Sequence, residues 1–152
     1  MTPTFNRRQT LALGAGAICA AVLGASSDPV LAKNDADEAI KKFTGGKTPA
    51  QGKVKLDLPE IAENGNTVPM TVTVESPMTE QSYVSDILIV ADENPRSGIA
   101  TFHFSPASGA AEANTRIRLA STQDVIAVAK MNDGSFFIAS KQVKVTIGGC
   151  GG

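Results

Sequence analysis

The chain has 152 residues, 14 Lys and Arg against 15 Asp and Glu, and a net charge of −1. This length suits one domain with one core, and interspersed charges without a basic run argue against a nucleic-acid-binding surface. The lack of Trp and an aromatic content of 5% leave no stacking platform for bases or sugars.

The first 32 residues have the pattern of an export signal. Arg7 and Arg8 stand before an uncharged, mostly apolar run at residues 11–23, and Val30-Leu31-Ala32 has the small-residue pattern of a cleavage site. Paired arginines before such a run are typical of the twin-arginine route, and the run is shorter than the ~20 residues of a membrane span. We therefore expect residues 1–32 to be removed and the protein to reach the periplasm. An uncleaved membrane anchor is the alternative.

The chain has two cysteines, Cys19 and Cys150. Cys19 lies within the expected signal, and Ile18 before it is larger than a lipoprotein cleavage site accepts, so we assign Cys19 to the removed segment. That segment holds two basic residues and one acidic residue, so the mature chain would carry a net charge of −2. A single cysteine cannot form an internal disulfide. The thiol of Cys150 must stay free, pair with another molecule or carry a group.

Residues 34–43 have the pattern of a short helix. Asn34 or Asp35 can cap its start, and Gly45 follows its end. Three apolar residues fall on one face, which we expect to pack on the body of the domain: Ala36, Ile40 and Phe43.

From residue 53 onward the apolar period changes to two, which is typical of strands. The expected strands lie at residues 54–58, 68–74, 83–91, 99–104, 116–119, 125–129, 136–138 and 142–147. Turn signals occur at Asn64-Gly65-Asn66 and Asn132-Asp133-Gly134, and residues 105–114 read as a connection. Short strands at this spacing predict an all-β domain over residues 33–147, an immunoglobulin-like antiparallel β-sandwich with a short N-terminal helix. A small open barrel is the alternative, and we expect a partner to cover one edge or apolar patch.

The chain ends in Gly148-Gly149-Cys150-Gly151-Gly152, directly after an alternating strand pattern. Glycine reaches backbone conformations closed to other residues, so we expect Gly148, Gly149, Gly151 and Gly152 to form a thin, flexible arm that leaves the body at Ile147. Cys150 would then stand roughly 10 Å from the body, at ~3.3–3.6 Å per residue. A frayed terminus is the alternative, but a thiol centred among four glycines favours a function.

Few other residues offer chemistry. His103 is the only histidine, and we expect it on a strand face in a structural or exposed position. One His and one Cys do not make a metal cluster, so we expect no metal, no cofactor and no catalytic residue. Arg116 and Arg118 share a strand face and can contact an anion or a partner, although plain solvent exposure is the simpler expectation.

The surroundings of Cys150 in the sequence hold neither a helix N-terminus nor a nearby cation that would favour the thiolate. The thiol is therefore expected to be mostly protonated at neutral pH. This pattern favours an attachment point for cargo, activated inside whichever enzyme receives the tail.

The sequence resembles the SoxY family, which carries sulfur in bacterial thiosulfate oxidation. The resemblance covers essentially the whole mature chain, and the signal departs from the usual pattern only at Thr10, where phenylalanine is common. It is most specific at the tail, and its motifs are Ile61-Ala62-Glu63-Asn64-Gly65, Val68-Pro69, Ser76-Pro77-Met78, Asn94-Pro95, Thr115-Arg116-Ile117-Arg118-Leu119-Ala120 and Val145-Thr146-Ile147-Gly148-Gly149-Cys150-Gly151-Gly152.

The resemblance implies that Cys150 is the covalent attachment point for sulfur intermediates and that the chain is not itself an enzyme. It implies a stable SoxZ-like partner in a heterodimer. It also implies transient partners: a SoxAX-type cytochrome that couples thiosulfate to the cysteine, a SoxB-type hydrolase that releases sulfate, and a SoxCD-type dehydrogenase that oxidises the remaining sulfane sulfur. The family fold is the immunoglobulin-like sandwich, and no nucleic acid or membrane is expected as a partner after signal cleavage.

Two other functions stay open at this point. An exported interaction module would use Cys150 for an intermolecular disulfide. A thiol enzyme, such as a peroxidase or disulfide exchanger, is the least favoured because a second cysteine and activating charges are missing.

Overall fold

The computed structural model describes residues 35–149. The expected signal, with Arg7 and Arg8, lies outside the described residues, as do Cys150, Gly151 and Gly152. The elements are α2 (Ala36–Thr44), β1 (Ala50–Gln51), β2 (Val54–Asp57), β3 (Ile61–Asn64), β4 (Val68–Val74), β5 (Val84–Ala91), β6 (Gly98–His103), the short 3-10 helix η1 (Pro106–Ser108), β7 (Ala111–Ile117), β8 (Gln123–Met131) and β9 (Phe136–Ile147).

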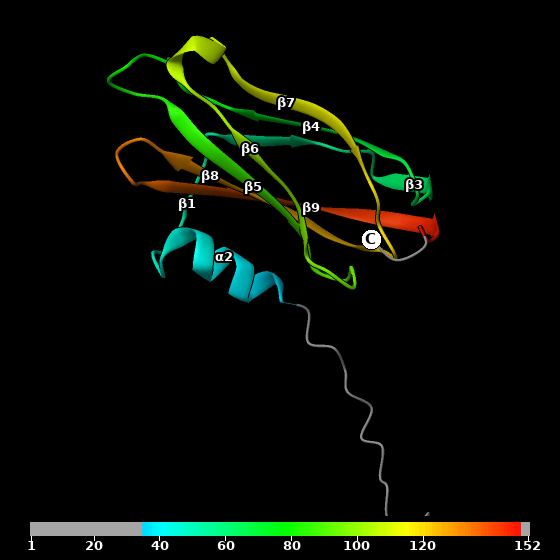
Figure 1. Ribbon diagram of the computed structural model, residues 1–152. Coiled ribbons are helices and arrows are strands. Elements are labelled where there is room, and N and C mark those ends of the chain that lie inside the picture. Colours follow the sequence, from blue (N-terminus) through cyan, green and yellow to red (C-terminus); the bar gives the residue numbers. More distant parts are fainter. Residues whose placement is uncertain (1–34, 150–152) are drawn as a thin grey trace, which may run out of the picture. The chain divides into compact units, whose positions relative to one another are not determined.

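The strands form two sheets that face each other (Figure 1). The larger sheet has the order β1-β9-β8-β5-β6, with β3 also paired to β9, and the smaller sheet has the order β2-β4-β7. The pairs are antiparallel, except that β1 and β3 run parallel to β9. The expected all-β sandwich is confirmed, while the two short parallel pairs were not foreseen.

The core lies between the two sheets and consists of aliphatic side chains. Strand β4 shows the principle, because fully buried residues alternate with more accessible ones along its length. Each large side chain fully buried here contributes roughly 1.5–3 kcal/mol relative to an exposed position. The largest apolar side chains in this core with almost no exposed surface are Val68, Met70, Val72, Val84, Ile87, Ile89, Leu119, Val125 and Val143.

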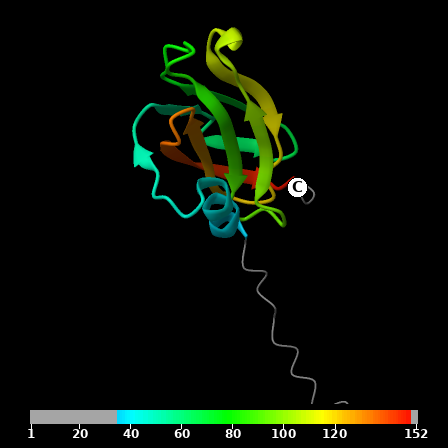
Figure 2. The ribbon, with the colours of Figure 1, turned by 60° about the vertical axis from the view of Figure 1, so that its left-hand side comes forward.

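Helix α2 covers the outer face of the larger sheet, on the side away from β2 and β4 (Figure 2). Ala36 packs with Leu88 and Val90 of β5, and the expected face of the helix contributes Ile40 and Phe43. Gly45 ends the helix with φ 63° and donates its N–H to the carbonyl of Lys41, as its position predicts. Within residues 35–149 no helix is both long and apolar enough to cross a membrane.

Asp35 occupies the N-cap position, but its side chain does not cap the helix. Its Oδ1 instead accepts a hydrogen bond from the Ser97 N–H at 3.1 Å. The start of the helix is thereby tied to the loop between β5 and β6.

Strands β1 and β3 lie outside every expected strand, and two further strands differ clearly from their expected bounds. Strand β9 is one 12-residue strand where two were expected, because residues 136–143 pair with β8 and the ladder continues at residues 144–147 with β3. Strand β7 begins at Ala111 rather than at residue 116, because its whole length pairs with β4. Its first residues are small or polar and show no clear alternation of apolar and polar side chains. Backbone pairing with β4, rather than a side-chain pattern, therefore defines this strand.

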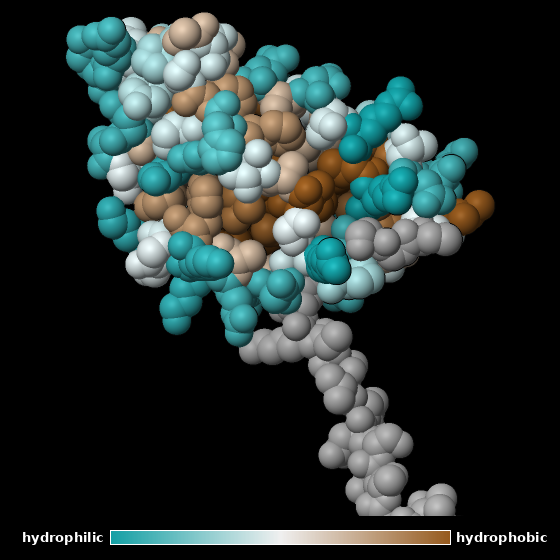
Figure 3. Space-filling view, in the orientation of Figure 1, coloured by the Kyte–Doolittle hydropathy of each residue, from teal (hydrophilic) through white to brown (hydrophobic). Residues whose placement is uncertain are grey.

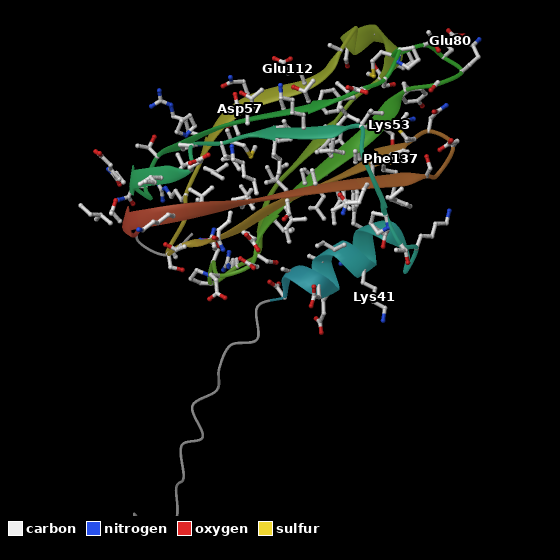
Figure 4. All side chains as sticks on the ribbon, turned by 180° about the vertical axis from the view of Figure 1, so that it is seen from behind. Lys41, Lys53, Asp57, Glu80, Glu112 and Phe137 are labelled. Atoms are coloured by element: carbon white, nitrogen blue, oxygen red, sulfur yellow. The ribbon has the colours of Figure 1, made fainter. Side chains whose placement is uncertain are left out.

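The outer face of the smaller sheet is polar. Asp57 and Glu112 are exposed, and Figure 4 shows both on the side of the sheet away from α2. At the other end Lys53 lies beside Phe137 of β9, with Nζ 4.7 Å from the ring centroid (Figure 4). This cation–π contact links the start of β2 to the larger sheet.

His103 lies on a strand face, as expected, with its side chain 76% exposed. Its Nδ1 is 2.6 Å from Oδ1 of Asp86, the β5 residue that pairs directly with His103. Ser85 Oγ donates to Asp86 Oδ2 at 2.7 Å, and Lys130 Nζ lies 3.9 Å away. Partial burial opposes ionisation of Asp86, but the hydrogen bonds from Ser85 and His103 and the nearby positive charges outweigh it, so the pKa of Asp86 lies below its usual value.

We predict that Asp86→Asn reduces stability at neutral pH and flattens the loss of stability in acid. The pKa of Asp86 is lower in the folded chain than in the unfolded chain, where it is about 3.9. Its stabilising contribution is therefore present above that pH and is lost as the pH falls through the folded-state value. Solvent screening keeps the expected loss at pH 7 to about 0.2–1 kcal/mol. Urea unfolding midpoints between pH 7 and pH 2 measure it.

The matched control is Glu112→Gln, an exposed carboxylate on β7, which should leave the neutral-pH midpoint unchanged. An acid profile of Asp86→Asn that parallels the wild type would show that the Asp86 cluster does not stabilise the fold.

Candidate functional site

The first two glycines of the tail lie against the body of the domain. Gly149 is buried, and its N–H donates to the carbonyl of Leu119 at 2.9 Å. The Gly65 N–H donates to the carbonyl of Ile147 at 2.8 Å. The expectation that the chain leaves the body at Ile147 was wrong, because its contact with the body continues at least to Gly149.

We call Gly65, Gly148 and Gly149 the glycine seam, because the backbone there approaches other backbone too closely for a side chain. A Cβ on Gly65 would overlap the carbonyl oxygen of Leu119, and one on Gly148 would overlap that of Ala120. A Cβ on Gly149 would lie 2.8 Å from the Gly65 oxygen. None of the three has a positive φ, so close approach rather than backbone freedom requires glycine here.

Leu119 is the hub of the seam. Its N–H donates to the Gly65 carbonyl at 2.8 Å, while its own carbonyl accepts the Gly149 N–H. Its side chain is fully buried in the core. One residue therefore connects the β3–β4 turn, the core and the root of the tail.

Two buried amide side chains hold the segment around Leu119 in place. Asn94 Oδ1 accepts hydrogen bonds from the Ala120 N–H and from Gln123 Nε2, each at 2.9 Å. Asn94 Nδ2 donates to the Arg118 carbonyl at 2.9 Å, and Gln123 Oε1 accepts the Glu93 N–H at 3.0 Å. Buried polar groups with their hydrogen bonds satisfied fix a single arrangement, so the platform for the tail is rigid.

The last residues of β9 are held from both sides. The Val145 N–H donates to Thr122 Oγ1 at 3.0 Å, and Thr146 Oγ1 donates to the Ala62 carbonyl at 3.2 Å. Figure 1 shows the end of β9, β3 and the end of β7 together at one end of the sandwich. Ile61 and Ile147 stand out at this end because they are 58% and 68% exposed.

In the sequence, Asn94 stands out only as part of a family motif, Gly65 only as part of a turn signal and a family motif, and Gln123 not at all. An Asn-Pro pair and a turn glycine are common in loops, so neither signals a contact with residues 118–120. Only the fold brings these positions to the root of the tail.

The other residues singled out in the sequence lie elsewhere or have another role. His103 belongs to the Asp86 cluster on β5 and β6. Arg116 and Arg118 are exposed and line a pocket together with Arg96. In the described part of the chain no group of three or more His, Cys, Asp or Glu side chains is arranged to hold a metal ion.

We predict that Gly148→Ala and Gly65→Ala each destabilise the protein by roughly 1–3 kcal/mol, the usual cost of overpacking. In both variants the new methyl group meets a backbone carbonyl that cannot rotate away, so the seam must open. Hydrogen exchange of the Gly149 amide should become faster, because its bond to Leu119 is broken.

Gly98→Ala is the matched control, since a Cβ there meets nothing within 4 Å and φ is not positive. It should change stability by less than about 0.5 kcal/mol. Equal Gly149 exchange rates in the Gly148→Ala variant and the control would contradict the seam.

The chain matches the family described as "Sulfur oxidation protein SoxY" over residues 40–150. Among solved structures it is similar to the sulfur carrier protein SoxY from Chlorobium limicola f thiosulfatophilum, with 32% identity, a TM-score of 0.60, and coverage of 73% of this chain and 96% of that chain. No curated protein sequence gives a significant match.

Its fold is also similar to that of superoxide reductase (neelaredoxin) from Ignicoccus hospitalis, with 18% identity, a TM-score of 0.56, and coverage of 62% of this chain and 80% of that chain. Identity at this level concerns the fold alone. The match over residues 40–150 and the 32% identical solved structure agree with each other and with the tail motif. The chain belongs to the SoxY family of sulfur oxidation proteins.

Proposed function

We propose that this protein is a non-catalytic carrier that holds thiosulfate-derived sulfur intermediates covalently on Cys150. Family membership supports a sulfur carrier in sulfur oxidation, and Cys150 is the only cysteine after the expected signal. The observation that carries the proposal is the anchoring of Gly149 on Leu119 at 2.9 Å. It fixes the backbone one residue before the sole thiol, on a body that holds no metal-binding cluster within residues 35–149.

Atoms and electrons balance in each step of such a carrier cycle when partner enzymes act on the loaded cysteine. The Cys150 thiolate and thiosulfate join through a new S–S bond and release two electrons to a SoxAX-type cytochrome, which leaves Cys–S–S–SO3−. Water then cleaves the terminal sulfonate as sulfate and two protons in a SoxB-type hydrolase, which leaves the persulfide Cys–S–S−. A SoxCD-type dehydrogenase takes six electrons from that outer sulfur, three waters supply its oxygens, and six protons leave.

In this proposal the reach of the arm, residues 148–152, depends on whether Gly149 is bound to the glycine seam. With Gly149 seated on Leu119, the Cα of Cys150 lies about 3.8 Å from that of Gly149. When the Gly149 bond opens and the chain is held only at Ile147, the thiol reaches roughly 10 Å. A backbone hydrogen bond contributes about 1 kcal/mol net, so an enzyme that binds the extended tail can supply the energy to release it.

The proposed setting is the periplasm, reached by the twin-arginine route, in a stable heterodimer with a SoxZ-like subunit. Family membership supports partners from the same sulfur oxidation system. The enzymes named above would bind transiently to the end of the sandwich that carries the tail root. The exposed Ile61 and Ile147 at that end provide apolar surface for such contacts.

We predict that tetrathionate loads the mature chain at Cys150 without any enzyme. The thiolate attacks a central sulfur of tetrathionate, forms Cys–S–S–SO3− and releases thiosulfate, as in thiol–disulfide exchange. Mass spectrometry of the C-terminal peptide should find one added S–SO3 group, and a SoxB-type hydrolase should then release one sulfate per chain.

Cys150→Ser is the control and should show neither the adduct nor sulfate release. A carrier role is excluded if the Cys150→Ser chain supports the same sulfate release with the partner enzymes. If a disulfide-linked dimer, seen by non-reducing electrophoresis, is the only form active with those enzymes, the protein is an interaction module instead.

A further inference from the structure

Three arginines converge on one pocket beside the root of the tail. Arg96 comes from the loop between β5 and β6, while Arg116 and Arg118 come from the end of β7 and the residue that follows it. The pocket has a volume of about 210 Å³ and lies where the edge strands of the two sheets, β6 and β7, come together. The remaining lining residues are Asn94, Gly98, Ile99 and Ile117.

Within residues 35–149, no acidic side chain forms an ion pair with the arginines of this pocket. No Asp or Glu lines it, and within residues 35–149 the ion pairs closer than 4 Å involve only Asp86, His103 and Lys130. Asp92, in the same loop, directs Oδ1 to the Asp124 N–H at 2.8 Å instead. Three arginine residues line one hollow of an overall acidic chain, and an anion bound among them would reduce the repulsion between their like charges.

The backbone beneath the arginines is fixed in advance. The Arg118 carbonyl accepts a hydrogen bond from the buried Asn94 Nδ2, and the N–H of Ser97, the residue after Arg96, is held by Asp35 Oδ1. A site that is already ordered loses less entropy when it binds a ligand. Planar guanidinium groups with several donors match the oxygens of a sulfonate or sulfate.

The pocket adjoins the seam through the chain itself. Arg118 is bonded to Leu119, whose carbonyl holds Gly149, and Cys150 follows directly. A group attached to the thiol is thus tethered to the same short segment that presents Arg118. In the orientation of Figure 1, the surface shows a band of hydrophobic residues, brown, bordered by hydrophilic residues, teal (Figure 3).

We propose that Arg96, Arg116 and Arg118 form a binding site for a sulfur oxyanion. The ligand is either the sulfonate end of the group carried on Cys150 or free sulfate or thiosulfate, which share the same tetrahedral, oxygen-rich chemistry. The first source rests on the proposed carrier function, whereas the second does not. An occupied site keeps the anionic group against the body between visits to enzymes.

The first arm of the test uses the mature Cys150→Ser chain, so no cargo is present. Backbone NMR shifts of Gly98 and Arg118 are followed while sulfate or thiosulfate is added at constant ionic strength, because salt screens exposed charges. We expect saturable shifts, with an affinity at least tenfold weaker in the triple variant Arg96→Gln, Arg116→Gln, Arg118→Gln. The charge-matched control is Lys41→Gln, Lys42→Gln, Lys55→Gln, which should bind as the parent does.

The second arm compares the native chain before and after loading with tetrathionate. Shifts of the same two amides that do not depend on protein concentration, and that vanish in the arginine variant, identify the tethered sulfonate as the ligand. If the two amide shifts change only in the first arm, free sulfate or thiosulfate is the ligand.

The proposal is overturned if the titration is linear, if the lysine control loses as much affinity as the arginine variant, or if neither arm moves these amides. It is also overturned if the arginine variant changes only binding to a partner protein. Mass spectrometry of Cys150 in the same samples keeps this outcome separate from a failure of the carrier function. If Cys150 is loaded but the amide shifts of Gly98 and Arg118 do not change, the anion site is ruled out and the carrier function is not affected.

Discussion

The structure depends on the close approach of three backbone segments at Leu119. The turn after β3, the segment after β7 and the first glycines of the tail meet there through hydrogen bonds of 2.8–2.9 Å. Because the Leu119 side chain is also fully buried, core packing and tail position depend on the same residue. The glycines serve this contact by lacking side chains, a role different from the flexibility for which such residues are usually cited.

The rest of the sandwich supplies the stiffness that this contact needs. Asn94 and Gln123 are buried among apolar side chains and hold the Leu119 segment through its neighbours. Helix α2 covers the far face of the larger sheet and ties its start to the β5–β6 loop through Asp35. Hydrogen bonds of this kind hold the backbone of the pocket arginines and the root of the tail on the same segments of the fold.

Much of the fold could be predicted from the sequence, because periodicity reports directly on which side of a strand is buried. Helix α2, its apolar face, the β8–β9 turn and most strands follow that signal. The signal fails where pairing, rather than side-chain alternation, defines the strand, as in the first residues of β7 and in the parallel pair of β3 with β9. The GGCGG motif pointed to the tail, but the sequence could not show that Gly148 and Gly149 rest on Ala120 and Leu119, since that depends on residues far apart in the chain. The same holds for Arg96, which gave no signal until the loop placed it beside Arg116 and Arg118.

The parallel pairing of β3 with β9 also bears on how the protein matures. The bond between Thr146 and Ala62 joins residues 84 positions apart, and closing so large a loop costs conformational entropy and slows folding. The seat for the tail therefore needs segments that are far apart in the chain to be in place. An incompletely folded chain lacks it, and its thiol would meet solvent and other chains without the body beside it. Correct docking of the last glycines thus marks a carrier that is ready for use.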